Sequence, residues 1–96
     1  MKAKTAKAPL RLEWWPAERL NEHPENWRVH PAGQAKALRT MLDQVGWAGA
    51  CLFNERTGRL IDGHLRKKLA RRGERVPVLV GSWTEQNERK ILATLD

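Results

Sequence analysis

One stretch of this sequence, residues 60–66 (LIDGHLR), constrains the fold more than any other. Its apolar start predicts a short strand, and the basic run from His64 predicts a helix that follows this strand after a single glycine. The first backbone N–H groups of such a helix have no intrahelical partner and lie at the positive end of its dipole, which favours an anion. Gly63 can take a positive φ and lets a ligand approach the main chain. We therefore expect a phosphate site at Gly63, within reach of the His64 and Arg66 side chains.

Arg66 is the one cation of this predicted helix that falls on its apolar side. A helix that begins at Gly63 and ends at Gly73 places Leu65 and Leu69 on one side, and Arg66 lies within the same arc. We interpret Arg66 as facing an anion inside the domain. The alternative is that its long side chain passes over small neighbouring residues and reaches water.

The polar loop before the first long helix is a second source of ligand groups. Asn26 and Arg28 lie in this loop, and we expect one of them to close the phosphate site. The alternative is a simple polar connection. His23 and His30 have no Cys or third ligand near them in the sequence, so they make a poor metal motif, and no metal site is predicted.

The clearest helix of the chain begins at Pro31 and ends at Gly46. Its apolar stripe is made by Leu38, Met41, Leu42 and Val45. Gln34 falls in the middle of this stripe, where a polar side chain needs a partner. Either it hydrogen-bonds to the backbone or it lines the same cavity as Arg66.

Four short strands are expected, at residues 10–15, 50–54, 58–62 and 76–80. In the first strand the alternation places Leu10, Leu12 and Trp14 on one face and Arg11, Glu13 and Trp15 on the other. The second and third strands form a hairpin that leads into the helix after Gly63. A last helix, capped by Thr84, carries Glu88 on its apolar side, and the simplest interpretation is a first-turn residue that points to water. The alternative for Glu88 is a functional role.

These elements predict a single α/β (α+β) domain, residues 10–96, with a mixed sheet of about four strands and three helices. The 96-residue chain is 41% apolar and has five Trp, so it can form a core of its own. It has no long apolar run and no signal peptide, and we expect it in the cytoplasm. Cys51, the single cysteine, is expected to be a buried thiol. Whether the natural chain continues past Asp96 stays open.

The net charge of +7 and the isoelectric point near 10.3 favour an acidic partner, either nucleic acid or nucleotide. Residues 1–9 are expected to form a flexible basic arm. A DNA-contacting face is predicted from the outward cations Lys67, Lys68, Arg71, Arg72 and Arg75. Because no helix looks built to read bases, we expect DNA binding to be nonspecific. The alternative is a solvated basic face without a partner.

This order of motifs resembles the ParB/sulfiredoxin superfamily, and within it the ParB-like nuclease-type N-terminal domains of phages and mobile elements. The resemblance covers residues 10–96, and its most specific stretches are residues 28–31 (RVHP) with Gln34 and residues 62–66 (DGHLR). In relatives the segment that matches Gly63 to Arg66 wraps the phosphates of a nucleotide, CTP in partition ParB and ATP in sulfiredoxin. The resemblance therefore implies a nucleoside triphosphate, CTP or ATP, with Mg²⁺ as an accompanying ion.

Two departures from the family pattern concern the residues after the glycine. Partition ParB has an acidic residue and two arginines there, whereas this chain has His64 and Leu65 before its arginine. Sulfiredoxin has its catalytic cysteine where His64 stands, so reduction of a sulfinic acid is not expected.

The sequence therefore predicts a nucleotide-binding or phosphate-binding domain associated with DNA. One rival is a metal-dependent nuclease or NTP hydrolase, for which Asp62 and Glu88 are the candidate carboxylates. The other rival is a DNA-binding or adaptor module that binds no nucleotide.

Overall fold

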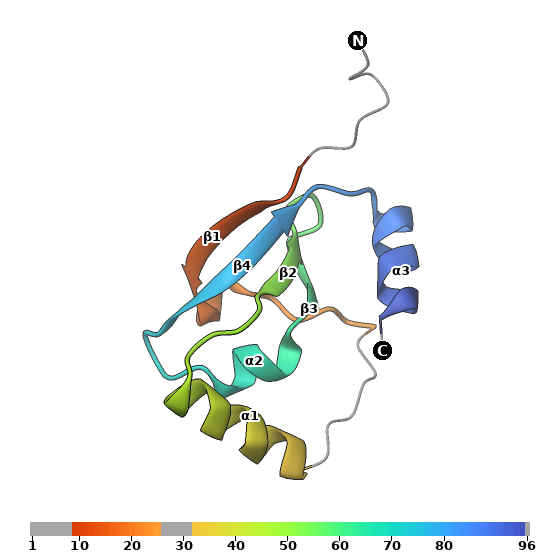
Figure 1. The fold of residues 1–96 in the computed structure, drawn as a ribbon. Coiled ribbons are helices and arrows are strands. Elements are labelled where there is room, and N and C mark those ends of the chain that lie inside the picture. Colours follow the sequence, from red (N-terminus) through yellow and green to blue (C-terminus); the bar gives the residue numbers. More distant parts are fainter. Residues whose placement is uncertain (1–8, 26–31, 96) are drawn as a thin grey trace.

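The structure, a computed structural model, describes residues 9–25 and 32–95 and contains one four-stranded mixed sheet (Figure 1). The strands, in the sheet order β1-β4-β2-β3, are β1 (Arg11–Pro16), β4 (Arg75–Gly81), β2 (Cys51–Asn54) and β3 (Arg59–Asp62). The helices are the 3-10 turn η2 (Ala17–Arg19), α1 (Ala32–Gln44), α2 (His64–Leu69) and α3 (Glu85–Thr94). This architecture confirms the predicted fold class.

The strand directions explain why α2 follows the β2–β3 hairpin. β1 runs antiparallel to β4, β2 runs antiparallel to β3, and β2 runs parallel to β4. Two parallel neighbours cannot be joined by a tight turn, so the chain passes through β3 and α2 before it returns as β4. Figure 1 shows α2 at one end of the sheet, α1 packed beyond it, and α3 on the β3 side. No helix in the described ranges is long and apolar enough to cross a bilayer.

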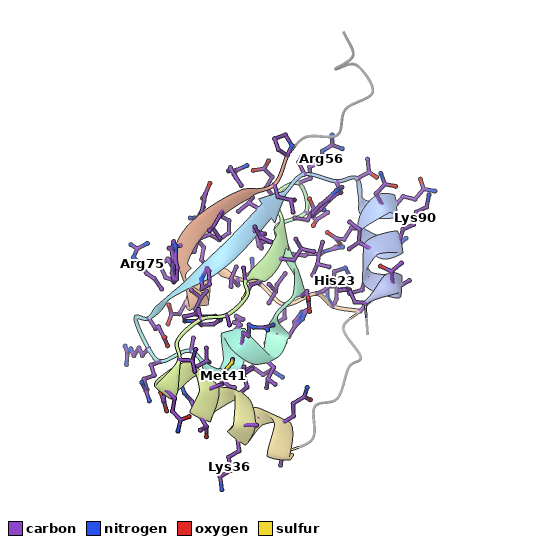
Figure 2. All side chains as sticks on the ribbon, viewed as in Figure 1. His23, Lys36, Met41, Arg56, Arg75 and Lys90 are labelled. Carbon is purple, nitrogen blue, oxygen red and sulfur yellow. The ribbon has the colours of Figure 1, made fainter. Side chains whose placement is uncertain are left out.

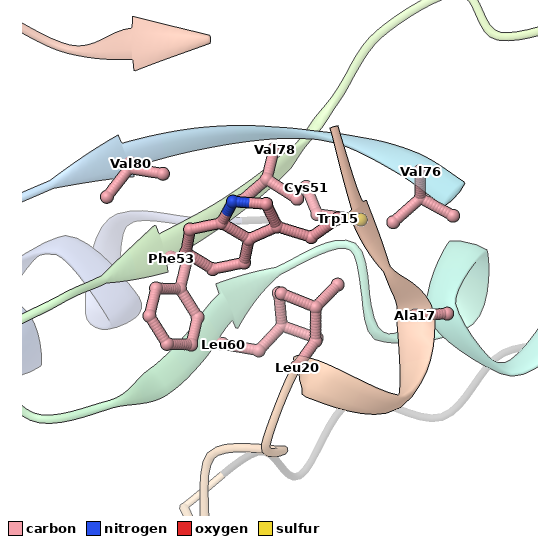
Figure 3. Packing of buried hydrophobic residues seen from close by; sticks show 9 residues of the cluster. All are labelled: Trp15, Ala17, Leu20, Cys51, Phe53, Leu60, Val76, Val78 and Val80. Carbon is pink, nitrogen blue, oxygen red and sulfur yellow. The ribbon is translucent and has the colours of Figure 1, made fainter. Parts of the chain in front are cut away.

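The hydrophobic core lies on one face of the sheet (Figure 3). Trp15 and Phe53 meet edge to face, with ring centroids 5.0 Å apart and an interplanar angle of 78°. The other buried members of this cluster are Ala17, Leu20, Cys51, Leu60, Val76, Val78 and Val80. Cys51 is fully buried, as predicted, and burial raises the pKa of its thiol to about 11.

The buried face of β1 is the one that carries Trp15. Trp15 is 6% exposed, whereas Leu12 and Trp14, on the opposite face, are 59% and 50% exposed. The Trp15 indole N–H donates to Glu13 at 2.7 Å, and the Arg19 guanidinium lies 4.0 Å above the ring. The more apolar face of this strand is therefore the exposed one.

Helix α2 is shorter than predicted, because it ends at Leu69 rather than near Gly73. The chain leaves the helix at Ala70, which is extended, and then turns through Gly73 at a φ of 80°. The Glu74 carboxylate accepts the Arg71 N–H at 2.7 Å, which stabilises this turn. The last carbonyl of the helix, that of Leu69, accepts a hydrogen bond from Arg39 of α1.

The end of α1 follows the prediction closely. Gly46 has a φ of 95° and donates its N–H to the Leu42 carbonyl at 3.1 Å, so it caps the helix. Of the predicted apolar stripe, Leu42 is buried, but Val45 is 73% exposed. Val45 lies after the last helical residue and thus falls outside the packed turns.

Candidate functional site

A cavity of about 590 Å³ lies between α1 and α2 and is lined by all four residues of the predicted phosphate site that the structure describes. Asp62, Gly63, His64, Leu65 and Arg66 contribute one wall. The facing wall comes from Gln34, Ala37, Leu38 and Met41 of α1, and Leu95 adds the end of α3. Figure 2 shows Met41 between the two helices. The lining mixes apolar side chains with the polar groups of Gln34, Asp62, His64 and Arg66, and the volume is in the range of small-molecule sites.

Gly63 connects β3 to α2 under two constraints. Its φ of 98° lies in the left-handed region, where side chains other than glycine are strained. In addition, a Cβ at this position would lie 2.8 Å from the Cys51 sulfur and 3.0 Å from the Cys51 Cα. The Gly63 N–H, which we expected to face a ligand, donates to the Asp62 carboxylate at 2.9 Å.

His64 occupies the first turn of α2 and is only 3% exposed. Its Nε2 accepts the backbone N–H of His23 at 3.2 Å, a contact that spans the loop and the helix. An accepting Nε2 places the ring proton of neutral His64 on Nδ1. His64 therefore borders the cavity through a ring that the loop holds in place.

Arg66 lies on the cavity wall and is half-buried. Its guanidinium rests against Gly49 in the connection between α1 and β2. A Cβ at Gly49, where φ is 127°, would lie 3.4 Å from Arg66 Nη2. Gly49 thus leaves room for the guanidinium, a relationship that we did not predict.

Gln34 lines the cavity together with Arg66 from an exposed position on α1. Asn26 and Arg28 lie outside the described residues, so their part in closing the site stays a prediction.

Glu88 is fully buried, and the expectation that it points to water is wrong. Its carboxylate accepts hydrogen bonds from His23 Nε2 at 2.8 Å, from Asn54 Nδ2 at 2.8 Å and from Arg59 Nη1 at 3.3 Å. The Thr57 hydroxyl also donates to it. Burial by itself would raise the pKa of Glu88, but the hydrogen bonds from these four groups lower it below the ordinary value. In the sequence, this network was indicated by the position of Glu88 on the apolar side of a helix, because a carboxylate buried there requires hydrogen-bond partners.

Most cations of the predicted DNA face are exposed, but they do not share one helix face. Lys68 lies on α2, whereas Arg71 and Arg72 lie in the turn after it and Arg75 begins β4. Several have protein partners: Lys67 lies 3.8 Å from Glu22, Arg71 lies 3.1 Å from Asp43, and Arg75 donates to the Trp14 carbonyl at 3.1 Å. The lysines of residues 1–8 lie outside the described part of the chain.

The described residues contain no cluster of three or more His, Cys, Asp or Glu side chains with the arrangement of a metal site. The two candidate carboxylates have different surroundings. Asp62 lines the cavity and accepts the Gly63 N–H, whereas Glu88 is buried among its four hydrogen-bond donors.

No protein-family model matches this sequence, and no curated protein matches it. Similar folds are found among solved structures, including the following two. One is a Pnob8-like ParB-N domain, with a TM-score of 0.71 and 21% identity over 86% of this chain and 34% of that one. The other is a C-terminally truncated chromosome-partitioning protein ParB from Caulobacter crescentus complexed with CTP-gamma-S, with a TM-score of 0.70 and 19% identity. This match covers 85% of the present chain and 50% of the Caulobacter chain.

The present chain thus spans about one third and one half of these two proteins. At 19% and 21% identity, the likeness is one of fold. The shared fold agrees with the resemblance that the sequence suggested. This chain has the fold of a ParB N-terminal domain.

Proposed function

We propose that this domain binds a nucleoside triphosphate in the cavity between α1 and α2 and acts in association with DNA. The observation that carries the proposal is that Gln34, from α1, lines one cavity together with Gly63, His64 and Arg66. One structure of the same fold is complexed with a CTP analogue, which supports a nucleotide as the ligand class.

The cavity lining suits a phosphate-bearing ligand that also has an apolar part. Arg66 supplies a guanidinium, the side chain best matched to phosphate oxygens. Leu38, Met41 and Leu65 supply apolar surface. Arg28 and Asn26 remain our candidates for closing the site from the preceding loop.

Mg²⁺ fits this arrangement as a companion of the phosphates. Asp62 is the carboxylate on the cavity lining, and Mg²⁺ is commonly held by one or two carboxylates together with substrate phosphates. The ion would neutralise phosphate charge. Asp62 would have to keep its hydrogen bond to the Gly63 N–H or exchange it for the ion.

Association with DNA is the second part of the proposal and rests on the exposed cations Lys68, Arg71, Arg72 and Arg75. We expect nonspecific contacts to the phosphate backbone, because no helix in the sequence looks built to read bases. A cytoplasmic location and an origin in a phage or mobile element are further predictions of the same proposal.

The rival enzyme function, a metal-dependent nuclease or NTP hydrolase, has less support. A nuclease of this kind needs carboxylates that are free to hold one or two ions. Glu88 is enclosed by four hydrogen-bond donors, and Asp62 is the only carboxylate of the described residues that lines the cavity. An adaptor that binds no nucleotide would not explain why the predicted phosphate-binding residues line one cavity.

Calorimetric titration with CTP, ATP and GTP, each with and without Mg²⁺ and then with duplex DNA, tests the proposal. Saturable binding of one nucleotide supports it. Turnover of nucleotide or cleavage of DNA that depends on a divalent ion would favour the enzyme. Salt-sensitive DNA binding with no response to any nucleotide would favour the adaptor.

A further inference from the structure

A buried polar chain connects α3 to the cavity wall through the loop before α1. It begins at Glu88, continues through His23 and ends at His64. These three side chains are 0%, 3% and 3% exposed. Figure 2 shows His23 in the space between β3 and α3. A buried chain of this kind needs every donor and acceptor to be matched, so each member restricts the next.

The hydrogen bonds determine the proton positions along this chain. His23 Nδ1 accepts the Glu25 N–H at 3.0 Å, so its proton is on Nε2 and is donated to Glu88 at 2.8 Å. With its ring held at both nitrogens, His23 directs its own backbone N–H to His64 Nε2 at 3.2 Å. The acceptor role of Nε2 then fixes His64 in the Nδ1–H tautomer.

Glu88 also anchors the helix that contributes another part of the cavity wall. Leu95, at the end of α3, lines the cavity about two turns beyond Glu88. Asn54 Nδ2, from the end of β2, bonds both Glu88 and the Trp83 carbonyl, so it fixes the start of the helix to the sheet. One carboxylate therefore helps to hold two separate parts of the lining.

We propose that Glu88 and His23 are positioning residues for the cavity, which hold the His64 ring and the end of α3 in the geometry that binds the ligand. This inference rests on the proposed nucleotide site. Neither residue needs to touch the ligand, because both act through His64 and Leu95. Four donors converge on the two carboxylate oxygens, an arrangement that an amide with a single acceptor oxygen cannot satisfy.

The test compares Glu88→Gln with Glu85→Gln in the full chain. Glu85 is a matched control because it lies one turn earlier on α3 and contacts the same Arg59, at 2.9 Å, but its side chain is 52% exposed. Two readouts are taken: the affinity for CTP and ATP with Mg²⁺, and the ring ¹⁵N shifts of His23 and His64 in long-range ¹H–¹⁵N spectra. The ring shifts report the tautomer, which a loss of stability alone would not change in a folded protein.

We expect Glu88→Gln to weaken nucleotide affinity about tenfold and to shift the His64 ring nitrogens, with no such change in Glu85→Gln. A folded Glu88→Gln protein with wild-type ring shifts and affinity within about twofold of wild type would overturn the inference. If wild-type protein binds no nucleotide, the proposed function fails, and the ring shifts still decide whether Glu88 holds His64.

If Glu88→Gln does not fold, two further measurements still test the inference. The wild-type spectra must show His23 protonated on Nε2 and His64 on Nδ1 at neutral pH, and the opposite tautomer at His64 overturns the inference. Thr57→Val removes one donor to Glu88 with little change in shape, and we expect it to shift the His64 ring in the same direction by a smaller amount. Unchanged His64 shifts in folded Thr57→Val would count against the chain of contacts.

Discussion

A side chain on residue 63 would collide with Cys51: a Cβ on Gly63 would lie 2.8 Å from the Cys51 sulfur and 3.0 Å from its Cα. The glycine is thus needed for packing against β2 as well as for its φ of 98°. The close packing of Gly63 on Cys51 places the start of α2, which lines the cavity, directly against β2.

Gly63→Val should therefore act on folding before it acts on binding. We expect the free energy of unfolding to fall by at least about 2 kcal/mol, from backbone strain and overpacking together. Chemical denaturation of the variant measures this change. The double variant with Cys51→Ala should recover only part of the loss, because the backbone of residue 51 and the strained φ remain; full recovery would show that the sulfur contact alone matters.

Arg66→Ala should weaken nucleotide binding by about 1.5–3 kcal/mol, the usual contribution of a charge-assisted hydrogen bond, with little change in stability. Calorimetry and thermal unfolding measure the two quantities. Lys68→Ala is the control, since Lys68 is an exposed cation of the same short helix and does not line the cavity. An equal loss of affinity in both variants would point to general charge rather than to a site.

Replacement of Lys68, Arg71, Arg72 and Arg75 by Gln should reduce the slope of log K against log salt for duplex DNA. Each phosphate contact contributes about −0.9 to this slope, so we expect it to flatten by about 3–4 if all four contact DNA. Lys90→Gln, on α3, is the control; Figure 2 shows Lys90 and Arg75 on opposite sides of the molecule. A wild-type slope near zero, or strong preference for one DNA sequence, would argue against this DNA face.

The buried Glu88 should make stability depend on pH in the acid range. Its pKa in the folded protein is lowered from 4.5, so the folded state binds this proton more weakly than the unfolded state does. The resulting stabilisation is present above this unfolded value of 4.5 and is lost as the pH falls through the folded pKa.

Denaturation of wild type and Glu88→Gln between pH 3 and pH 7 measures this contribution. Exposed carboxylates such as Glu13 and Asp43 also have a lowered pKa, so only the difference between the two proteins isolates Glu88. We expect this difference to shrink toward low pH. A difference that does not change with pH would mean that the pKa of Glu88 is the same in the folded and unfolded states, and a difference that shrinks toward high pH would mean that folding raises this pKa.

The local sequence pattern was sufficient to predict most of the helices and strands. The strand-glycine-helix connection at Gly63, the Thr84 cap and the Gly46 cap depend on residues adjacent in sequence, and the structure has each of them. The Thr84 side chain, for example, accepts the Asn87 N–H at 3.1 Å. The inward side of α2 also followed from local periodicity, which is why Arg66 was expected on the cavity wall.

Contacts between distant segments needed the tertiary structure. His23 and Glu88 are 65 residues apart, and neither has a local reason to meet the other. Likewise, the alternation in β1 did not show which face would be buried. Trp15 is buried because it packs into the core cluster, whose other members are distant from it in the sequence or follow the strand.

By itself the sequence determined the elements, their order and the glycine at which strand becomes helix, because these follow from backbone conformation and local periodicity. Only the tertiary structure decided that Gln34 shares a cavity with Arg66, that Gly49 lies against the Arg66 guanidinium and that Glu88 is buried. The physical reason is that burial and partner choice depend on which segments the sheet order brings together, and a buried carboxylate is stable only where several donors from such segments converge.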